Sequence, residues 1–163
     1  TDLLHHLYKN KKSLYVCGNG GSAAIANHFA CDHLKGIREK TNIGPKVYSL
    51  SSNIELITAI SNDIKFDDIF TFQLSSLAEK NDCLLTISSS GSSKNIIKEI
   101  KWAKKNNLKT ISFNGFNGGK ASKISDVSIN VSSKNYGIIE DIHQTIMHIL
   151  AQILIKKNSS RKP

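Results

Sequence analysis

The chain has 163 residues, a length that suits one globular domain with a buried core. Its formal charge is +9, but the lysines fall in short polar clusters and aromatic residues make up only 7% of the chain. This pattern argues against the continuous basic face with stacking aromatics that binds nucleic acid. The charge is compatible with a small anionic substrate. We find no pattern typical of a signal peptide or a membrane span.

Predicted strands and helices alternate along the whole chain. Taken in chain order, strands are expected at 13–17, 46–50, 83–87, 110–113 and 127–131. Helices are expected at 2–9, 22–34, 54–60, 67–78, 94–104 and 138–155, with a turn at 61–63 and loops at 37–45 and 114–119. This alternation predicts a three-layer α/β fold with a mostly parallel sheet. Ligands bind such sheets beyond the carboxyl ends of the strands.

The three cysteines, Cys17, Cys31 and Cys83, are odd in number and show no CxxC spacing. Each lies in an apolar segment. We therefore expect buried free thiols in a reducing cytoplasm rather than disulfides or metal ligands.

The turn Asn19-Gly20-Gly21-Ser22 lies between the first predicted strand and the next helix. Glycines allow a sharp turn, and a helix N-terminus offers unpaired N–H groups to an anion. A plain tight turn with Ser22 as N-cap is the alternative. The Walker pattern is absent because no Gly-Lys-Ser/Thr follows. A dinucleotide is also disfavoured, because the second strand is followed by Ser51-Ser52-Asn53 instead of an acidic residue. We expect no nucleotide cofactor.

A second turn precedes the helix at 94–104 and contains four serines. The hydroxyls of Ser88, Ser89, Ser90 and Ser93 can surround a phosphate together with backbone N–H groups, and Gly91 adds flexibility. A flexible loop is the alternative. Both turns fall at the carboxyl ends of predicted strands, so Ser22 could close the same pocket.

Candidate acid–base or metal-binding residues occur on two predicted helices. His28 and Asp32 are spaced i, i+4 and share a helix face, whereas His33 points elsewhere. A histidine hydrogen-bonded beside the glycine turn explains His28 equally well. The late candidates in the final helix are Glu140, Asp141, His143 and His148. Glu140 and His148 lie two turns apart, roughly 12 Å along an ideal helix, too far for one metal ion unless the helix begins after Glu140 or the side chains reach far.

Several motifs in a fixed order resemble those of a known family. They are Asn19-Gly20-Gly21-Ser22, His28-Phe29-Ala30, Asn62-Asp63, the turn at 88–93, Gly118-Gly119-Lys120 and the late histidine helix. The chain resembles a sugar isomerase (SIS) domain and, within that family, the phosphoheptose isomerases. The resemblance implies one flavodoxin-like SIS domain over residues 1–163, with a five-stranded parallel sheet in an α/β/α sandwich. It also implies a homotetramer with active sites at subunit interfaces, and a further helix upstream of residue 1.

The resemblance assigns roles to particular residues. It implies a phosphate site formed by Ser88, Ser89, Ser90 and Ser93. It implies that the sugar is lined by Asn19, Gly20, Gly21, Ser22, Asn62, Asp63 and Glu140. It makes His28, Asp32, Glu140 and His148 a set of ligands for zinc or another divalent metal, and it makes Asp32 and His148 the acid–base pair.

The chain departs from the family pattern at the candidate site. Asp32 stands where glutamate is common, Glu140 stands where glutamine is common, and Lys35-Gly36 also differs. A base displaced by about 1 Å can lose on the order of 100-fold in rate. The expected function is isomerisation of sedoheptulose 7-phosphate to a heptose 7-phosphate, for lipopolysaccharide or capsule synthesis, in the cytoplasm and without nucleic-acid or membrane partners. The rival is a non-catalytic SIS module that binds a sugar phosphate or a protein.

Overall fold

A computed structural model describes residues 1–159 of the chain; residues 160–163 of the expected domain lie outside the described part. Its centre is a five-stranded sheet in the order β2-β1-β3-β4-β5, with every neighbouring pair parallel. The strands are β1 (Ser13–Gly18), β2 (Lys46–Ser49), β3 (Cys83–Ser88), β4 (Lys109–Gly115) and β5 (Val127–Val131). The predicted α/β fold with a five-stranded parallel sheet is confirmed.

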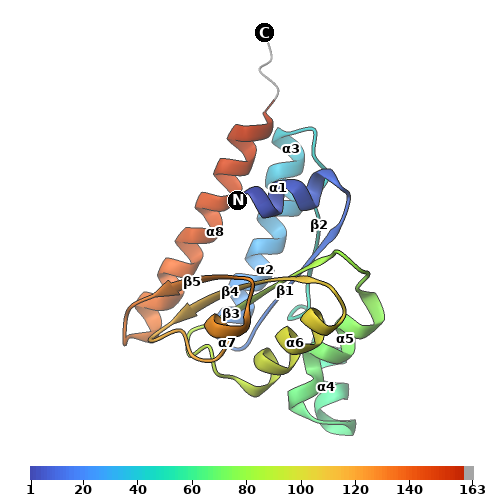
Figure 1. Cartoon of the computed structure of the whole chain (residues 1–163), viewed down its shortest axis with the longest axis vertical. Helices are drawn as coiled ribbons and strands as arrows, with labels where there is room; N and C mark the ends of the chain where they lie inside the picture. The colour runs from blue at the N-terminus through green and yellow to red at the C-terminus, as the bar shows by residue number, and fades with distance from the viewer. Residues whose placement is uncertain (160–163) are drawn as a thin grey trace.

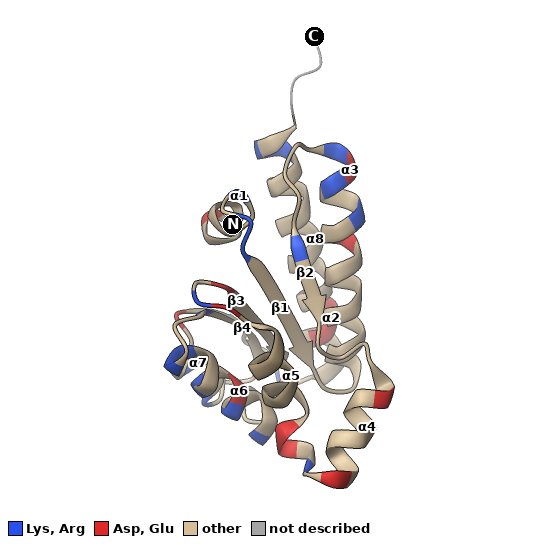
Figure 2. Cartoon of the chain, turned by 90° about the vertical axis from the view of Figure 1, so that its right-hand side faces the viewer, with Lys and Arg blue, Asp and Glu red and all other residues tan. Residues whose placement is uncertain are grey.

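Helices cover both faces of the sheet (Figure 1). One face is packed by α1 (Asp2–Lys9), α2 (Gly21–Cys31) and α8 (Tyr136–Asn158). The other is packed by α4 (Ile54–Asp63), α5 (Ile69–Leu77), α6 (Lys94–Lys105) and α7 (Ala121–Ile124). All six residues of the central strand β3 are buried, because helices cover it on both sides. Figure 2 shows basic and acidic residues side by side on α3 (Arg38–Lys40) and on α6.

The helix that begins at Gly21 continues further than predicted. After Cys31 it passes into a π-helical segment, Asp32–Ile37, and then into α3, Arg38–Lys40. The predicted helix end at residue 34 and the loop from residue 37 were therefore wrong. Ile37 is fully buried in the core, and this tertiary packing outweighs the weak helix propensity of Gly36.

Other differences from the predicted elements are smaller. The expected turn at 61–63 is the last turn of α4, because neither glycine nor proline interrupts the helix there. A 3-10 turn, Phe66–Asp68, precedes α5. Strand β4 extends into the expected loop at 114–119, and the short helix α7 follows it. Cys17 and Cys83 are buried free thiols as expected, but Cys31 is exposed, at the end of α2.

Helix α8 is long and apolar enough to cross a membrane by length and composition alone, with a mean hydropathy of 1.2, which we did not expect from the sequence. Only 28% of the most apolar 18-residue stretch of this helix is buried. Ile139, Met147 and Leu154 pack into the domain core, while Ile142 and Ile149 are exposed. One apolar face of this helix therefore covers the sheet, and a second face is left uncovered in the single chain.

Candidate active site

The glycine turn adopts a conformation that only glycine takes easily. Gly20 is the N-cap of α2, with φ 55° and ψ −124°. Gly21 lies so close to α8 that a Cβ there would be 2.5 Å from Glu140 Oε2. Ser22 sits inside the first turn of the helix, so it is not the N-cap that the tight-turn alternative supposed. The Ser51 hydroxyl braces the turn by donating to the Gly18 carbonyl oxygen at 2.9 Å.

The serine turn is held against the loop that follows β4. Gly91 and Gly119 both have positive φ, and a Cβ on either would overlap backbone atoms of the other segment. Ala121 N–H donates to the Gly91 carbonyl at 2.8 Å, and Gly115 N–H donates to the Ser89 carbonyl at 2.8 Å. These contacts give the Gly118-Gly119 motif a physical role, because only glycines allow the two loops to approach this closely.

Both turns line one small cavity of about 200 Å³. Its walls are Asn19, Ser22, Ile87, Ser88, Ser89, Ser90, Ser93, Tyr136 and Glu140. The cavity lies at the carboxyl ends of β1 and β3, as expected for a parallel sheet. A larger cavity, which contains Phe116 and Lys134, shares Ser90 and Tyr136 with it.

The four serine hydroxyls in this cavity are not equivalent. Ser88 Oγ accepts a hydrogen bond from Gly91 N–H at 3.2 Å, and Ser90 Oγ accepts one from Ser92 N–H at 3.2 Å. Ser93 is the N-cap of α6 but makes no side-chain capping bond. Ser89 Oγ is buried and has no hydrogen-bond partner among residues 1–159. A buried hydroxyl without a partner is costly, and an anion in the cavity would satisfy it.

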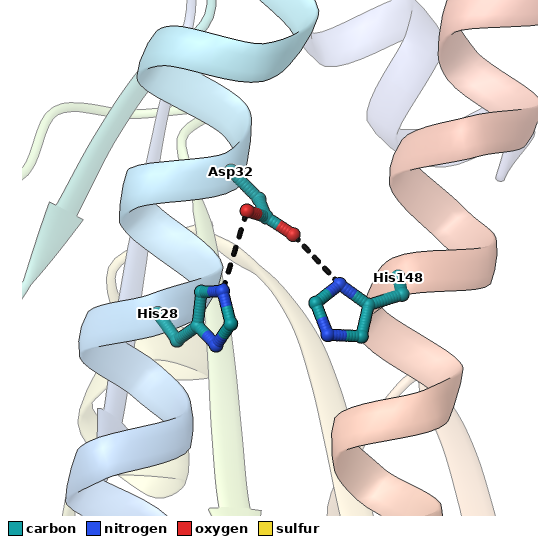
Figure 3. A group of neighbouring side chains, drawn as sticks. All are labelled: His28, Asp32 and His148. Atoms are coloured by element: carbon teal, nitrogen blue, oxygen red, sulfur yellow. Dashed lines mark hydrogen bonds and ion pairs between the residues drawn. The ribbon is translucent and has the colours of Figure 1, made fainter.

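A second cluster consists of His28, Asp32 and His148, which converge from α2, the π-helical segment and α8 (Figure 3). Asp32 Oδ2 lies 2.8 Å from His148 Nδ1, and Asp32 Oδ1 lies 3.4 Å from His28 Nε2. The two imidazole rings meet edge to face at 5.0 Å. The i, i+4 pair predicted from the sequence thus faces the late histidine, 116 residues away in the chain.

Glu140 does not join this cluster, although the resemblance put it among the metal ligands. Helix α8 begins at Tyr136, so Glu140 and His148 are separated by two full helical turns. Glu140 instead lines the cavity beside Gly21 and the serines. The side chain that lies between the histidines is Gln144, whose amide is 2.5 Å from His28 Nδ1 and 3.4 Å from His148 Nε2.

The donor set of the cluster fits a divalent cation. One ligand atom from each of His28, Asp32 and His148 lies within 4.8 Å of the others, which offers two imidazole nitrogens and one carboxylate oxygen. Catalytic zinc sites commonly have three protein ligands of these types and leave a further position for water or substrate. The Gln144 amide could add an oxygen ligand if its orientation were reversed.

The remaining candidates lie elsewhere. Asn62 and Asp63 are exposed at the end of α4, joined by a 2.8 Å hydrogen bond, and do not line the serine cavity of their own chain. His143 is buried and donates from Nε2–H to the backbone carbonyl oxygen of Asn114 at 3.0 Å, and burial lowers its pKa. His33 is also buried, which lowers its pKa to about 3. Neither buried histidine contacts the cavity.

Sequence reasoning missed three polar residues near the site. Gln144 precedes His148 by four residues, so helical spacing could have indicated it, but an amide is a weak sign of a ligand set. Asn95 forms a reciprocal amide pair with Asn19, at 2.9 and 3.0 Å. Glu99 is fully buried against Cys17. Asn95 is 76 residues from Asn19 in the chain, and Glu99 is 82 residues from Cys17, so no local sequence pattern connects either pair.

The fold and these two clusters define a class of protein. The chain belongs to the SIS domain family, whose model matches residues 1–115. Within that class it belongs to the phosphoheptose isomerases. A phosphoheptose isomerase from Helicobacter pylori is 38% identical over 152 residues, which are 93% of this chain and 79% of the relative. A probable phosphoheptose isomerase from Thermoplasma acidophilum is 37% identical over 157 residues, 96% of this chain and 86% of the relative.

Solved structures agree with this placement. The phosphoheptose isomerase GmhA from Neisseria gonorrhoeae superposes with a TM-score of 0.85 at 31% identity, over 94% of this chain and 81% of that one. A phosphoheptose isomerase from Francisella tularensis gives 0.85 at 29% identity, over 96% and 82%.

Proposed function

We propose that this protein is an aldose–ketose isomerase that converts sedoheptulose 7-phosphate to a heptose 7-phosphate through an enediolate. The observation that carries the proposal is the pairing of His148 with Asp32 on the same domain as a serine-lined anion cavity. A base removes the proton next to the carbonyl, and an acid returns a proton at the neighbouring carbon. The product would serve a surface polysaccharide such as lipopolysaccharide or capsule, made from cytoplasmic precursors.

The geometry favours distinct roles for the two residues. Asp32 accepts from His148 Nδ1–H, which leaves the lone pair of the neutral ring on Nε2. We therefore assign proton transfer to His148 Nε2, with Asp32 orienting the ring and stabilising its charged form. His28 Nε2 and Asp32 Oδ1 would hold a divalent cation such as zinc, because a His148 that takes the proton on Nε2 cannot bind the cation there at the same time. The cation would supply electrophilic stabilisation of a developing oxyanion. Ser88, Ser89, Ser90 and Ser93 would bind the phosphate, and Asn19, Gly20, Gly21, Ser22 and Glu140 would line the sugar.

The direct test is formation of an aldose phosphate from sedoheptulose 7-phosphate, measured with and without added zinc. We expect turnover, and a higher rate with the metal. Binding of the sugar phosphate without turnover under either condition would favour the rival, a non-catalytic SIS module.

We expect Ser89→Ala to weaken binding of sulfate or a sugar phosphate without destabilising the fold. The Ser89 hydroxyl has no partner in the described chain, so its loss removes nothing from the free protein. A hydrogen bond to a charged group contributes about 1.5–3 kcal/mol, which corresponds to roughly tenfold or more in affinity. Calorimetric titration measures the affinity, and thermal unfolding measures the stability. Equal affinity in the variant and the parent would remove Ser89 from the phosphate site.

We propose that the protein forms a homotetramer through its helices. The uncovered apolar face of α8 includes Ile142, Ile149 and Ile153, which are 38%, 49% and 38% exposed. Leu34 is also exposed, in the π-helical segment that packs against α8. Burial of apolar surface favours such association by about 25 cal/mol per Å². We expect sedimentation velocity at micromolar concentration to give a tetramer and Ile149→Glu to give smaller species. A monodisperse parent monomer would contradict the proposal.

A further inference from the structure

Helix α6 carries two buried polar side chains on the face that packs against the sheet. Asn95 is 2% exposed and Glu99 is 0% exposed. An acidic side chain is almost never fully buried without a partner, so its contacts need an explanation. Neither residue lines the serine cavity. Both, however, contact residues of the first strand and of the glycine turn that follows it.

The first contact joins Asn95 to Asn19. Asn95 Nδ2 donates to Asn19 Oδ1 at 2.9 Å, and Asn19 Nδ2 donates to Asn95 Oδ1 at 3.0 Å. Asn95 Oδ1 also accepts from Ile96 N–H at 2.9 Å, which holds the amide in place at the start of α6. This reciprocal pair of hydrogen bonds fixes the orientation of both amides. One donor and one acceptor of Asn19 are thereby committed to α6 and not to a ligand.

The second contact lies one helical turn further on. Cys17 Sγ–H donates to Glu99 Oε2 at 2.7 Å, and Glu99 Oε1 has no partner in the described part of the chain. Burial raises the pKa of Glu99 to about 8, so the neutral form of the carboxyl group predominates near pH 7. The pKa of the Cys17 thiol is also raised, chiefly by burial. The pair is therefore a hydrogen bond between two neutral groups.

The spacing of Asn95 and Glu99 along α6 fits the spacing of Asn19 and Cys17. Cys17 lies in β1 and Asn19 directly follows its last residue, and both side chains bond α6 on the same face of the sheet. Asn95 and Glu99 are four residues apart and share one face of α6. Helix α6 also begins directly after the serine turn, with Ser93 as its N-cap. One helix thus contacts both turns that form the cavity.

We propose that Asn95 and Glu99 are positioning residues that fix the glycine turn relative to the serine turn and so set the affinity of the cavity for the phosphate end of its ligand. The identity of that ligand rests on the proposed function, whereas the positioning of an anion site does not. Neither residue touches the reacting atoms.

The test compares variants that keep or remove the second contact. Glu99→Gln and Cys17→Ser keep a hydrogen-bonding pair of nearly the same shape, whereas Glu99→Leu and Cys17→Val remove it. We expect the two removing variants to raise the dissociation constant of sulfate and the KM of sedoheptulose 7-phosphate about fivefold to tenfold, with kcat within twofold of the parent. The two conservative variants should stay within twofold of the parent in all three quantities. Asn95→Leu should behave like Glu99→Leu.

Ile100→Val is the matched control, because Ile100 is fully buried in α6, does not line the cavity and has no polar side-chain group to bond either turn. An equal rise in the sulfate dissociation constant for Ile100→Val would show a general loss of stability and overturn the proposal. So would unchanged affinity in both Glu99→Leu and Cys17→Val. If Glu99→Leu fails to fold, Cys17→Val decides from the other partner of the contact. If no variant and no parent turns over the heptulose phosphate while the sulfate affinities differ as expected, the proposed reaction fails and the positioning role stands.

Discussion

His148→Ala is expected to lower kcat by a factor of about 10²–10⁴ and to leave the affinity for the sugar phosphate nearly unchanged. The imidazole is the proton carrier in the proposed reaction, while the serine cavity that binds phosphate is formed by other residues. Asp32→Asn is expected to act in the same direction. It keeps the shape of the side chain but removes the negative charge that holds the His148 ring in one tautomer and stabilises its charged form. Steady-state kinetics and calorimetric titration separate the two effects.

Two substitutions serve as controls for that result. Asp32→Glu retains a carboxylate and should keep activity, or raise it if the shorter acid is a poor fit. His6→Ala removes an exposed histidine on α1 and should change nothing. If Asp32→Asn turned over heptulose phosphate as fast as the parent, Asp32 would have no part in proton transfer. Glu140 would then be the first alternative, because its carboxylate lines the cavity.

Glu99→Gln is expected to stabilise the protein increasingly as pH rises from about 5 to about 7.5. Burial raises the pKa of Glu99 from 4.5 to about 8. Between these values the unfolded chain releases the proton while the folded protein keeps it, so the stability of the parent falls as pH rises. At about 1.36 kcal/mol per pH unit, the loss reaches about 3 kcal/mol over this range. Glutamine does not titrate and avoids it.

Urea unfolding of the parent and Glu99→Gln, at one protein concentration and at both pH values, measures this difference. The comparison between variants cancels the titration of all other groups. Glu39→Gln is a matched control, since Glu39 is exposed and ion-paired with Lys35 on the surface. A parent and a Glu99→Gln variant whose stability difference does not change with pH would show that Glu99 is ionised in the folded protein.

Much of the architecture could be predicted from the sequence because it depends on local periodicity. Apolar runs such as Cys83–Ser88 predict a strand buried on both faces, and the alternation of strands with helices predicts a parallel sheet. The continuation of α2 through Gly36 could not be predicted, because it depends on burial of Ile37 beneath distant segments. The exposure of Cys31 depends in the same way on which helix face meets the sheet.

Parts of the candidate site could likewise be predicted from local sequence, and other parts depend on tertiary packing. The proximity of His28 and Asp32 follows from helical spacing, and the serine cavity follows from a strand end joined to a helix start. His148 could be connected with them only through the resemblance to a family. The position of Gln144 between the histidines, and of Glu140 in the cavity instead of the cluster, depends on how α8 lies against α2. No spacing within one segment reports that contact.

The π-helical segment directly after Asp32 also affects how this protein is aligned with others. Its hydrogen bonds span five residues instead of four, so the segment Asp32–Ile37 accommodates one residue more than a regular helical turn. An alignment with a relative whose helix is regular here needs a one-residue gap just beyond Asp32. Without that gap, every downstream position as far as Lys40 would be compared with a residue on the wrong side of the partner's helix.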